Sequence, residues 1–300
     1  MRAGHRLVAG IMAMIFGLAG WWGRDLPADQ AWGVPSIDRA SLDVPFVPTP
    51  LSVVNEMLKL ADLDESDVLY DLGSGDGRIV ITAATRYGVR GVGIDLDPQR
   101  IMESRANAQL AGVEDRVRFI QGDLFEADLS EATAVTLYLL SSINERLRPK
   151  LLRELRPGTP VVSHSFSMGD WEPDKSITVE GRDVYLWIIP AQADGAWALN
   201  VDAPGGDQEF LLTLEQEYQK VDGTALIDGQ QVPVQDGQLL GDTLRFFVTR
   251  SIDGRDVTQA FVGRVNGDRI QGFVNELNRG GGRGTWTAQR TAAAAGVRYE

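Results

Sequence analysis

The chain has 300 residues, a net charge of −13, 43% hydrophobic residues and no cysteine. The length predicts about two domains, each with its own core, and the composition is typical of a soluble globular protein. The acidic balance disfavours sequence-independent binding of nucleic acid, which needs clustered lysine and arginine. Without cysteine no disulfide or thiolate metal site can form, and two histidines disfavour a histidine-rich metal site. We therefore expect neither a bound metal nor a nucleic-acid partner.

The first residues, 1–23, form a hydrophobic segment that we expect to lie outside the folded part. Arg2 and Arg6 precede Leu7–Trp22, a run of apolar and small residues. A basic stretch followed by such a run is typical of a signal peptide. The run is short for a bilayer span, which needs about 20 residues, so a signal peptide and a short membrane anchor compete. Residues 7–22 predict a protein that is either membrane-associated or exported, with its topology open.

A polar stretch with scattered prolines, residues 24–44, is interpreted as a linker. The residues Phe46–Pro50 then lead into an expected helix over Leu51–Ala61, whose apolar residues recur at helical spacing. Thr49 is predicted to be the N-cap of this helix, with Pro50 at its first position.

From residue 45 to about residue 192, strand and helix patterns alternate. This alternation predicts a Rossmann-like, doubly wound α/β domain, whose largely parallel sheet is covered on both faces. A further strand, Val184–Ile189, is expected to run antiparallel and close the sheet. The other expected strands are Asp67–Leu72, Gly91–Asp95, Val117–Gln121, Ala134–Leu139 and Pro160–Ser163, and the expected helices are Arg78–Tyr87, Pro98–Ala111 and Ile143–Leu155.

A glycine-rich turn, Asp71–Arg78, follows the first of these strands. Dinucleotide-binding folds need glycines in the pattern G-x-G-x-x-G, and Arg78 stands where the third of them belongs. Asp71, at the end of the strand, would repel a pyrophosphate but favour a ligand that carries an ammonium and a sulfonium. The turn therefore predicts a site for S-adenosylmethionine and not for NAD.

The order of four motifs resembles the class I, seven-strand methyltransferases, of which the Asp71–Gly77 turn would be motif I. The resemblance implies that Gly73, Gly75 and Gly77 shape the cofactor loop. It implies that Asp95 accepts hydrogen bonds from both ribose hydroxyls and that Asp123 and Leu124 hold the adenine. The turn Leu155–Thr159 resembles the Leu-x-Pro-Gly turn before strand five. Thr49 is a further cofactor candidate, since its hydroxyl could reach the cofactor's carboxylate, or it only caps the helix.

Methyl transfer from a sulfonium is an in-line displacement, so the protein mainly orients the two reactants in a dry channel. Candidates to line that channel are Tyr138 at the end of strand four and Phe166 after strand five. His164 is the third candidate. For all three, a role in packing or in structural hydrogen bonding is the alternative.

Between residues 44 and 190 the chain most resembles the group of the ATP synthase c-subunit lysine methyltransferase and its bacterial relatives. That resemblance implies an S-adenosylmethionine-dependent enzyme that methylates protein lysine, on a membrane-embedded or membrane-near target. A small-molecule methyltransferase is the rival among enzymes. A non-catalytic, membrane-tethered binding protein is the rival from another class.

The rest of the chain, 197–300, is predicted to be a small antiparallel β domain, a barrel or a sandwich. Short alternating runs such as Thr243–Thr249 and Ala260–Val265 are separated by turn dipeptides. The expected hairpin turns are Asp222-Gly223, Asp228-Gly229, Asp236-Gly237, Asp253-Gly254 and Asn266-Gly267. No residue here indicates chemistry, so we expect an accessory role.

Overall fold

The computed structural model describes residues 46–202, 207–252, 254–277 and 283–291. The predicted hydrophobic segment, 1–23, and the predicted linker, 24–44, lie outside the described residues. Among the residues that are described, no helix is long and apolar enough to cross a membrane.

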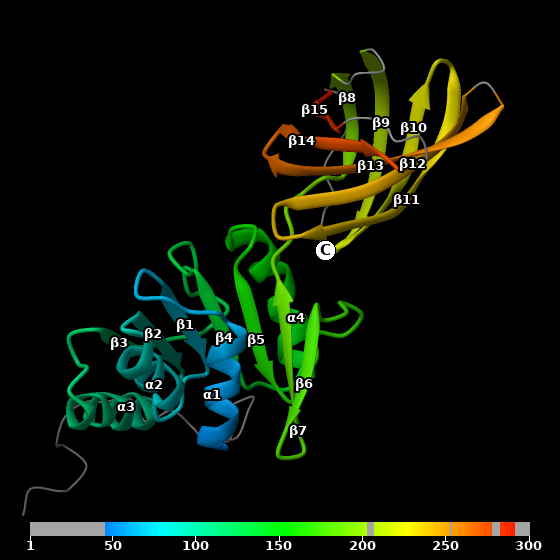
Figure 1. Cartoon of the computed structure of the whole chain (residues 1–300). Helices are drawn as coiled ribbons and strands as arrows, with labels where there is room; N and C mark the ends of the chain where they lie inside the picture. Colours follow the sequence, from blue (N-terminus) through cyan, green and yellow to red (C-terminus); the bar gives the residue numbers. More distant parts are fainter. Residues whose placement is uncertain (1–45, 203–206, 253, 278–282, 292–300) are drawn as a thin grey trace, which may run out of the picture. The chain divides into compact units, whose positions relative to one another are not determined.

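The first part is a seven-stranded sheet with the strand order β3-β2-β1-β4-β5-β7-β6 (Figure 1). Strands β3, β2, β1, β4 and β5 are parallel, while β7 runs antiparallel to both β5 and β6. The Rossmann-like α/β fold predicted from the alternating pattern is therefore confirmed. The strands are β1 (Val68–Leu72), β2 (Arg90–Asp95), β3 (Val117–Gln121), β4 (Ala134–Leu137), β5 (Pro160–His164), β6 (Lys175–Val179) and β7 (Arg182–Ile188).

Helices cover both faces of this sheet. On one face, apolar residues of α1 and α2 pack on Leu69, Ala134 and Val162, and α3 joins α2 over Phe119. On the other face, α4 packs on Tyr70 and on other central residues of the sheet. The helices are α1 (Leu51–Leu60), α2 (Arg78–Tyr87), α3 (Pro98–Ala111) and α4 (Ser141–Glu154). Two packed faces leave the carboxyl ends of the parallel strands as the place for a ligand.

The predicted cap of α1 is wrong. The N-cap is Pro50, no side chain caps the helix, and the helix begins at Leu51. The Thr49 hydroxyl instead lies 3.2 Å from Nδ1 of His164, and the Thr49 side chain is buried. The Thr49 hydroxyl therefore contacts His164, which is distant in the sequence, and does not cap the helix.

The second part is a closed barrel of antiparallel strands, each paired with its neighbour in sequence, with β15 closing on β8. Of the two predicted alternatives, a barrel or a sandwich, the barrel is correct. The strands are β8 (Gly195–Asp202), β9 (Gln208–Glu217), β10 (Lys220–Ile227), β11 (Gln230–Leu240), β12 (Thr243–Ile252), β13 (Arg255–Asn266), β14 (Arg269–Glu276) and β15 (Arg283–Arg290).

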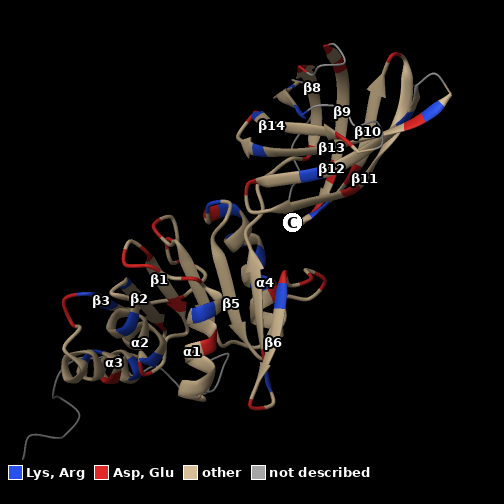
Figure 2. Ribbon diagram, viewed as in Figure 1, with Lys and Arg blue, Asp and Glu red and all other residues tan. Residues whose placement is uncertain are grey.

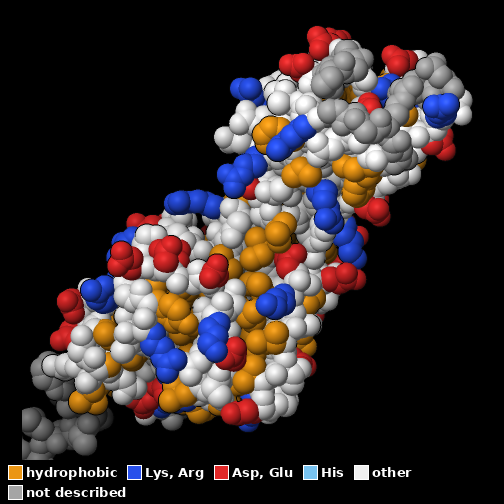
Figure 3. Space-filling model, viewed as in Figure 1, with side chains coloured by type: hydrophobic (Ala, Val, Ile, Leu, Met, Phe, Trp, Pro, Cys, Tyr) orange, Lys and Arg blue, Asp and Glu red, His pale blue; other side chains and the backbone are white. Residues whose placement is uncertain are grey.

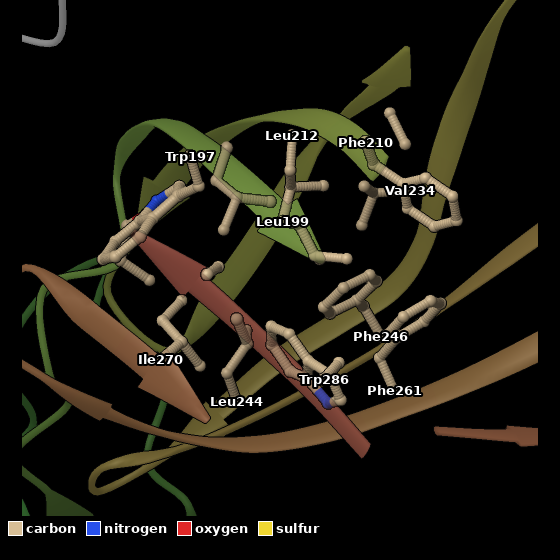
Figure 4. Close-up of a cluster of buried hydrophobic side chains, with 14 of the residues drawn as sticks. Trp197, Leu199, Phe210, Leu212, Val234, Leu244, Phe246, Phe261, Ile270 and Trp286 are labelled. Atoms are coloured by element: carbon tan, nitrogen blue, oxygen red, sulfur yellow. The ribbon is translucent and has the colours of Figure 1, made fainter. Parts of the chain in front are cut away.

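Large side chains fill the interior of the barrel (Figure 4). The rings of Phe246 and Phe261 are stacked with their centroids 4.8 Å apart, and the Trp286 ring meets both edge-on. All three residues are buried, as is Trp197. Among its described residues the barrel therefore has a filled hydrophobic core, as is usual for small barrels.

Two of the five predicted hairpin turns are wrong. Asp222-Gly223 lies inside β10 and Asp236-Gly237 lies inside β11, and at both places the strand register shifts. At both places the extra residue lies on β11, with three residues against two of β10 and two residues against one of β12. Such β-bulges bend a strand and help a sheet to close. Gly237 is required there, since a Cβ atom would lie 2.0 Å from the carbonyl oxygen of Val221. Asp228-Gly229 and Asn266-Gly267 do join successive strands. The fifth predicted turn includes Asp253, which lies outside the described residues.

Candidate active site

A pocket of about 280 Å³ opens at the carboxyl ends of β1, β2 and β4. Most of the predicted site residues line it, from both the cofactor set and the channel set. Gly77 and His164 do not line it. The predicted residues in the lining are Thr49, Asp71, Gly73, Gly75, Asp95, Asp123, Leu124, Tyr138 and Phe166.

The glycine turn is held against the end of β2. The amides of Gly73 and Ser74 both donate to the carbonyl oxygen of Ile94, at 2.8 and 2.9 Å. Gly75 has a φ of +52°, and a Cβ atom there would lie 2.4 Å from the Phe46 ring. The turn thus needs glycine for its backbone conformation and for the close approach of a neighbour. Gly77 lies behind the pocket as the N-cap of α2.

Asp71 is the second-last residue of β1 and is only 2% exposed. The Thr136 hydroxyl donates to one carboxylate oxygen at 2.7 Å. Burial raises the pKa of Asp71 to about 7, because a charged carboxylate is poorly solvated there, and the nearby Asp95 and Asp76 act in the same direction. A buried acid that lines an open pocket favours a cationic group in that pocket.

Asp95 ends β2, and backbone amides hold both of its carboxylate oxygens. The Gly75 amide donates to Oδ2 at 2.8 Å and the Asp97 amide to Oδ1 at 2.9 Å. Burial raises the pKa of Asp95, while these two amides oppose the rise. Each oxygen keeps lone pairs that can accept a further hydrogen bond. The carboxylate is therefore fixed in place and able to accept two hydroxyls.

Asp123 and Leu124 follow β3 in a short turn. The Phe125 amide donates to the Asp123 carboxylate at 2.9 Å, which shapes the turn at the pocket wall. Phe125 also lines the pocket, and the Arg146 guanidinium lies over its ring at 4.5 Å. A flat ligand fits between an acid and apolar side chains of this kind.

His164 lies behind Tyr138, at the part of the pocket where the channel to the cofactor was predicted. Its ring is fully buried and stacks on Tyr138, with the ring centroids 3.9 Å apart. Burial lowers the pKa of His164 to about 4, so the ring is neutral at physiological pH. Its Nε2 has no hydrogen-bond partner among the described residues. His164 therefore supports Tyr138 and Thr49, both of which line the pocket, without lining it.

Phe166 is placed by contacts that sequence reasoning missed. The buried Asn144 of α4 donates to the carbonyl oxygens of Phe166 and Ser167, at 3.1 and 3.3 Å. The preceding residue, Ser165, has a φ of +63°, a strained value for a residue other than glycine. The Phe166 ring lies 6.0 Å from the Tyr138 ring. Together the rings of Tyr138 and Phe166 form an aromatic wall of the pocket, at the predicted channel.

Phe46 and Arg100 were also missed. The Arg100 guanidinium lies 4.5 Å from the centroid of the Phe46 ring, and both residues line the pocket. The Arg78 guanidinium donates to the carbonyl oxygen of Thr49 at 3.0 Å. The segment before α1 is thus held over the glycine turn from two sides. The aromatic residue just ahead of a helix was a signal for this, but its partners lie far away in the sequence.

The residues fit S-adenosylmethionine. Asp71 would face its ammonium, the glycine turn leaves room for its chain, and Asp95 would take its ribose hydroxyls. A pyrophosphate at the glycine turn would meet the Asp71 carboxylate and be repelled. Fold and site together define an S-adenosylmethionine-dependent methyltransferase.

Known proteins agree with this class. Residues 71–175 match the model of the ANTKMT methyltransferase domain. A protein-lysine N-methyltransferase of Saccharolobus islandicus is 48% identical over 151 residues, which are 49% of this chain and 94% of that protein. The human lysine N-methyltransferase of the ATP synthase c-subunit is 34% identical, over 59% of this chain and 75% of the human protein. The chain belongs to the family of protein-lysine N-methyltransferases.

A solved structure is also similar. It is described as an RNA methyltransferase from Salinibacter ruber in complex with S-adenosyl-L-homocysteine. It is 64% identical and covers 49% of this chain and 95% of its own, with a TM-score of 0.48.

The buried Asp71 predicts that cofactor affinity depends on pH. The cofactor ammonium favours the ionised carboxylate, so below pH 7 binding must release a proton from Asp71. We expect the affinity for S-adenosylhomocysteine to fall by up to about tenfold per pH unit below 7, and to level off above 7. Calorimetric titrations between pH 5.5 and pH 8.5, values on the order of one unit to either side of that pKa, measure this.

Asp71→Asn removes the titrating group and should flatten this pH profile. Asp128→Asn, which changes an exposed acid, is the control and should keep the slope. A profile that is flat in the unchanged protein would contradict the account of Asp71.

Replacement of Asp95 tests the ribose contact. Asp95→Ala removes the acceptor for two hydroxyls and the anchor of the Gly75 amide. Hydrogen bonds to a charged group contribute about 1.5–3 kcal/mol each, so we expect affinity for S-adenosylhomocysteine to fall by at least about 100-fold. Asp95→Asn keeps one acceptor oxygen, so its affinity for S-adenosylhomocysteine should lie between those of the unchanged protein and Asp95→Ala. Unchanged affinity in a folded Asp95→Ala protein would rule out the contact.

Proposed function

We propose that this protein transfers the methyl group of S-adenosylmethionine to the side-chain amine of lysine in a membrane-associated protein. Family membership supports protein lysine as the acceptor. The aromatic wall of Tyr138 and Phe166, in the same pocket as Asp71 and the glycine turn, is the observation that carries the proposal. It gives the pocket an apolar side along which one extended side chain can lie.

The bound cofactor supplies the electrophilic methyl group, and the residues of the pocket supply orientation and a dry environment. An ammonium that enters between aromatic rings is attracted to their faces and loses water. Loss of water lowers the pKa of the amine, which must give up its proton before it attacks. His164 is neutral, so the layer behind Tyr138 does not repel the incoming ammonium. The proton then leaves to solvent through the open pocket.

A membrane-associated substrate is the finer part of the proposal. The relatives include enzymes named for the c-subunit of ATP synthase and for the adenine nucleotide translocase. The predicted hydrophobic segment at residues 7–22 would bring the enzyme to a bilayer, and this favours an acceptor located there.

Incubation with methyl-labelled cofactor and a membrane extract tests the acceptor. We expect label on a protein band, recovered as methyl-lysine after acid hydrolysis. Label only in small metabolites would favour the small-molecule rival, and label in RNA would contradict the proposal. Cofactor binding with no transfer to any fraction would favour the non-catalytic binding protein.

Tyr138 tests the aromatic wall. Tyr138→Ala removes one wall of the acceptor side, so we expect kcat to fall by about 10–100-fold, the loss typical of a misplaced reactant. The affinity for S-adenosylhomocysteine should change by less than about threefold, because Asp71 and Asp95 are untouched. Tyr138→Phe keeps the ring and is the matched control. Equal activity of the alanine and phenylalanine variants would show that the Tyr138 ring does not position the acceptor lysine.

A further inference from the structure

Charge is divided unevenly around the barrel. Strands β12–β15 carry seven arginines and two acids, whereas β8–β11 carry six acids and one lysine. Figure 2 shows blue segments on β12 and β14. The arginines are Arg245, Arg250, Arg255, Arg264, Arg269, Arg283 and Arg290; the acids beside them are Asp256 and Glu276; the acids of the other half are Asp202, Glu209, Glu215, Glu217, Asp222 and Asp236, and its lysine is Lys220.

Strand register places exposed apolar side chains among the arginines of the basic half. Arg245 pairs with Val262, and Val262 pairs in turn with Phe273 on the next strand. Val262 is 42% exposed and Phe273 is 47% exposed. Arg264 lies two residues beyond Val262 on the same side of β13, and the Arg283 guanidinium lies 3.7 Å from the Phe273 ring centroid. We name these five residues the basic face.

The charges of the basic face remain accessible. Arg264 lies 3.6 Å from the carboxylate of Asp242, yet its side chain is 76% exposed. Arg245 donates to Gln238, which is neutral. Arg283 covers one side of the Phe273 ring and is itself exposed. Figure 3 shows hydrophobic side chains next to Lys and Arg side chains on the visible face of the barrel.

We propose that the basic face binds the surface of a bilayer that contains anionic lipid. Apolar side chains that stand out between arginines enter the headgroup region, while the guanidinium groups bind lipid phosphates. The long arginine stems lie along the apolar surface and keep the charged ends at the headgroups. Anionic lipid would repel the acidic half of the barrel. This repulsion orients the barrel with the basic face toward the lipid.

RNA fits the same face less well. Sequence-tolerant binding of single strands uses several exposed rings on which successive bases stack. The basic face offers one ring, Phe273, and Arg283 already covers a side of it. Val262 is aliphatic, so it cannot stack on a base. It can, however, contact an acyl chain.

The net charge of −13 does not oppose this contact. At physiological ionic strength exposed charges are screened beyond about 8 Å, so the lipid responds to the charges next to it. The proposal concerns the barrel alone and does not depend on which molecule is methylated.

Co-sedimentation of the full chain with lipid vesicles tests the proposal. Partitioning is measured against lipid concentration with vesicles of phosphatidylcholine alone and with vesicles that also contain phosphatidylglycerol. Each arginine at an anionic surface strengthens binding by about fivefold. We therefore expect R245Q/R264Q to weaken binding to the anionic vesicles by about 20–30-fold, and to leave binding to neutral vesicles unchanged. F273S should weaken binding to the anionic vesicles severalfold.

The control is L211S/L226S, which lies outside the basic face and should leave binding to the anionic vesicles unchanged. These two leucines are 43% and 39% exposed and face each other across β9 and β10, in the acidic half. Every variant keeps residues 7–22, so a difference between variants reports on the barrel, and thermal unfolding shows whether each is folded. The proposal is overturned if the unchanged protein binds both vesicles equally or if folded R245Q/R264Q keeps its anionic preference. It is also overturned if the face instead binds a single-stranded RNA oligonucleotide without preferring anionic vesicles.

Discussion

The burial of one carboxyl group, that of Asp71, is the constraint on which the site depends. The parallel sheet places Asp71 at the end of β1, where its side chain is 2% exposed and has Thr136 as a hydrogen-bond donor. A carboxylate in such a place is poorly solvated, and its pKa rises to about 7. It is stabilised in its ionised form when a cation enters the pocket beside it. The glycine turn that follows leaves space for that cation, so the fold, the loop and the choice of ligand are linked by one residue.

Elements with local signals were predictable from the sequence. Helices α2 and α3 have the predicted bounds because they end at Gly88 and Gly112, both in the left-handed conformation, and because Pro98 begins α3. Strand β6 was missed because it is an edge strand with mostly exposed residues, so its pattern lacks a buried face. The place of Asp71 and Asp95 at the pocket was predictable for the same local reason, since a strand end and a glycine turn fix where these two residues lie.

Contacts between distant residues were not predictable. Thr49 was assigned to a helix cap, but it lies beside His164, which is 115 residues away in the chain. Asn144 places Phe166 through two carbonyl oxygens, and an asparagine within a helix gives no sign of this. In the barrel, Asp236-Gly237 has the composition of a hairpin turn, and only the pairing of β11 with β12, whose register shifts between Gln235 and Gln238, makes it a bulge. At the bulge it is Asp236 that has a positive φ, of +49°, and glycine is needed at position 237 because a Cβ atom there would meet the carbonyl oxygen of Val221.

The central claim is that the pocket selects a ligand that brings an ammonium to Asp71, as S-adenosylmethionine does, over a ligand with paired phosphates. Calorimetric titration of the protein with S-adenosylhomocysteine and with NAD, at one pH and one salt concentration, tests this claim most directly. The homocysteine compound keeps the ammonium, the ribose and the adenine of the donor, so the account predicts that it binds. It also predicts that NAD, whose pyrophosphate would meet Asp71, gives no measurable heat. Uptake of NAD without binding of S-adenosylhomocysteine would contradict the account.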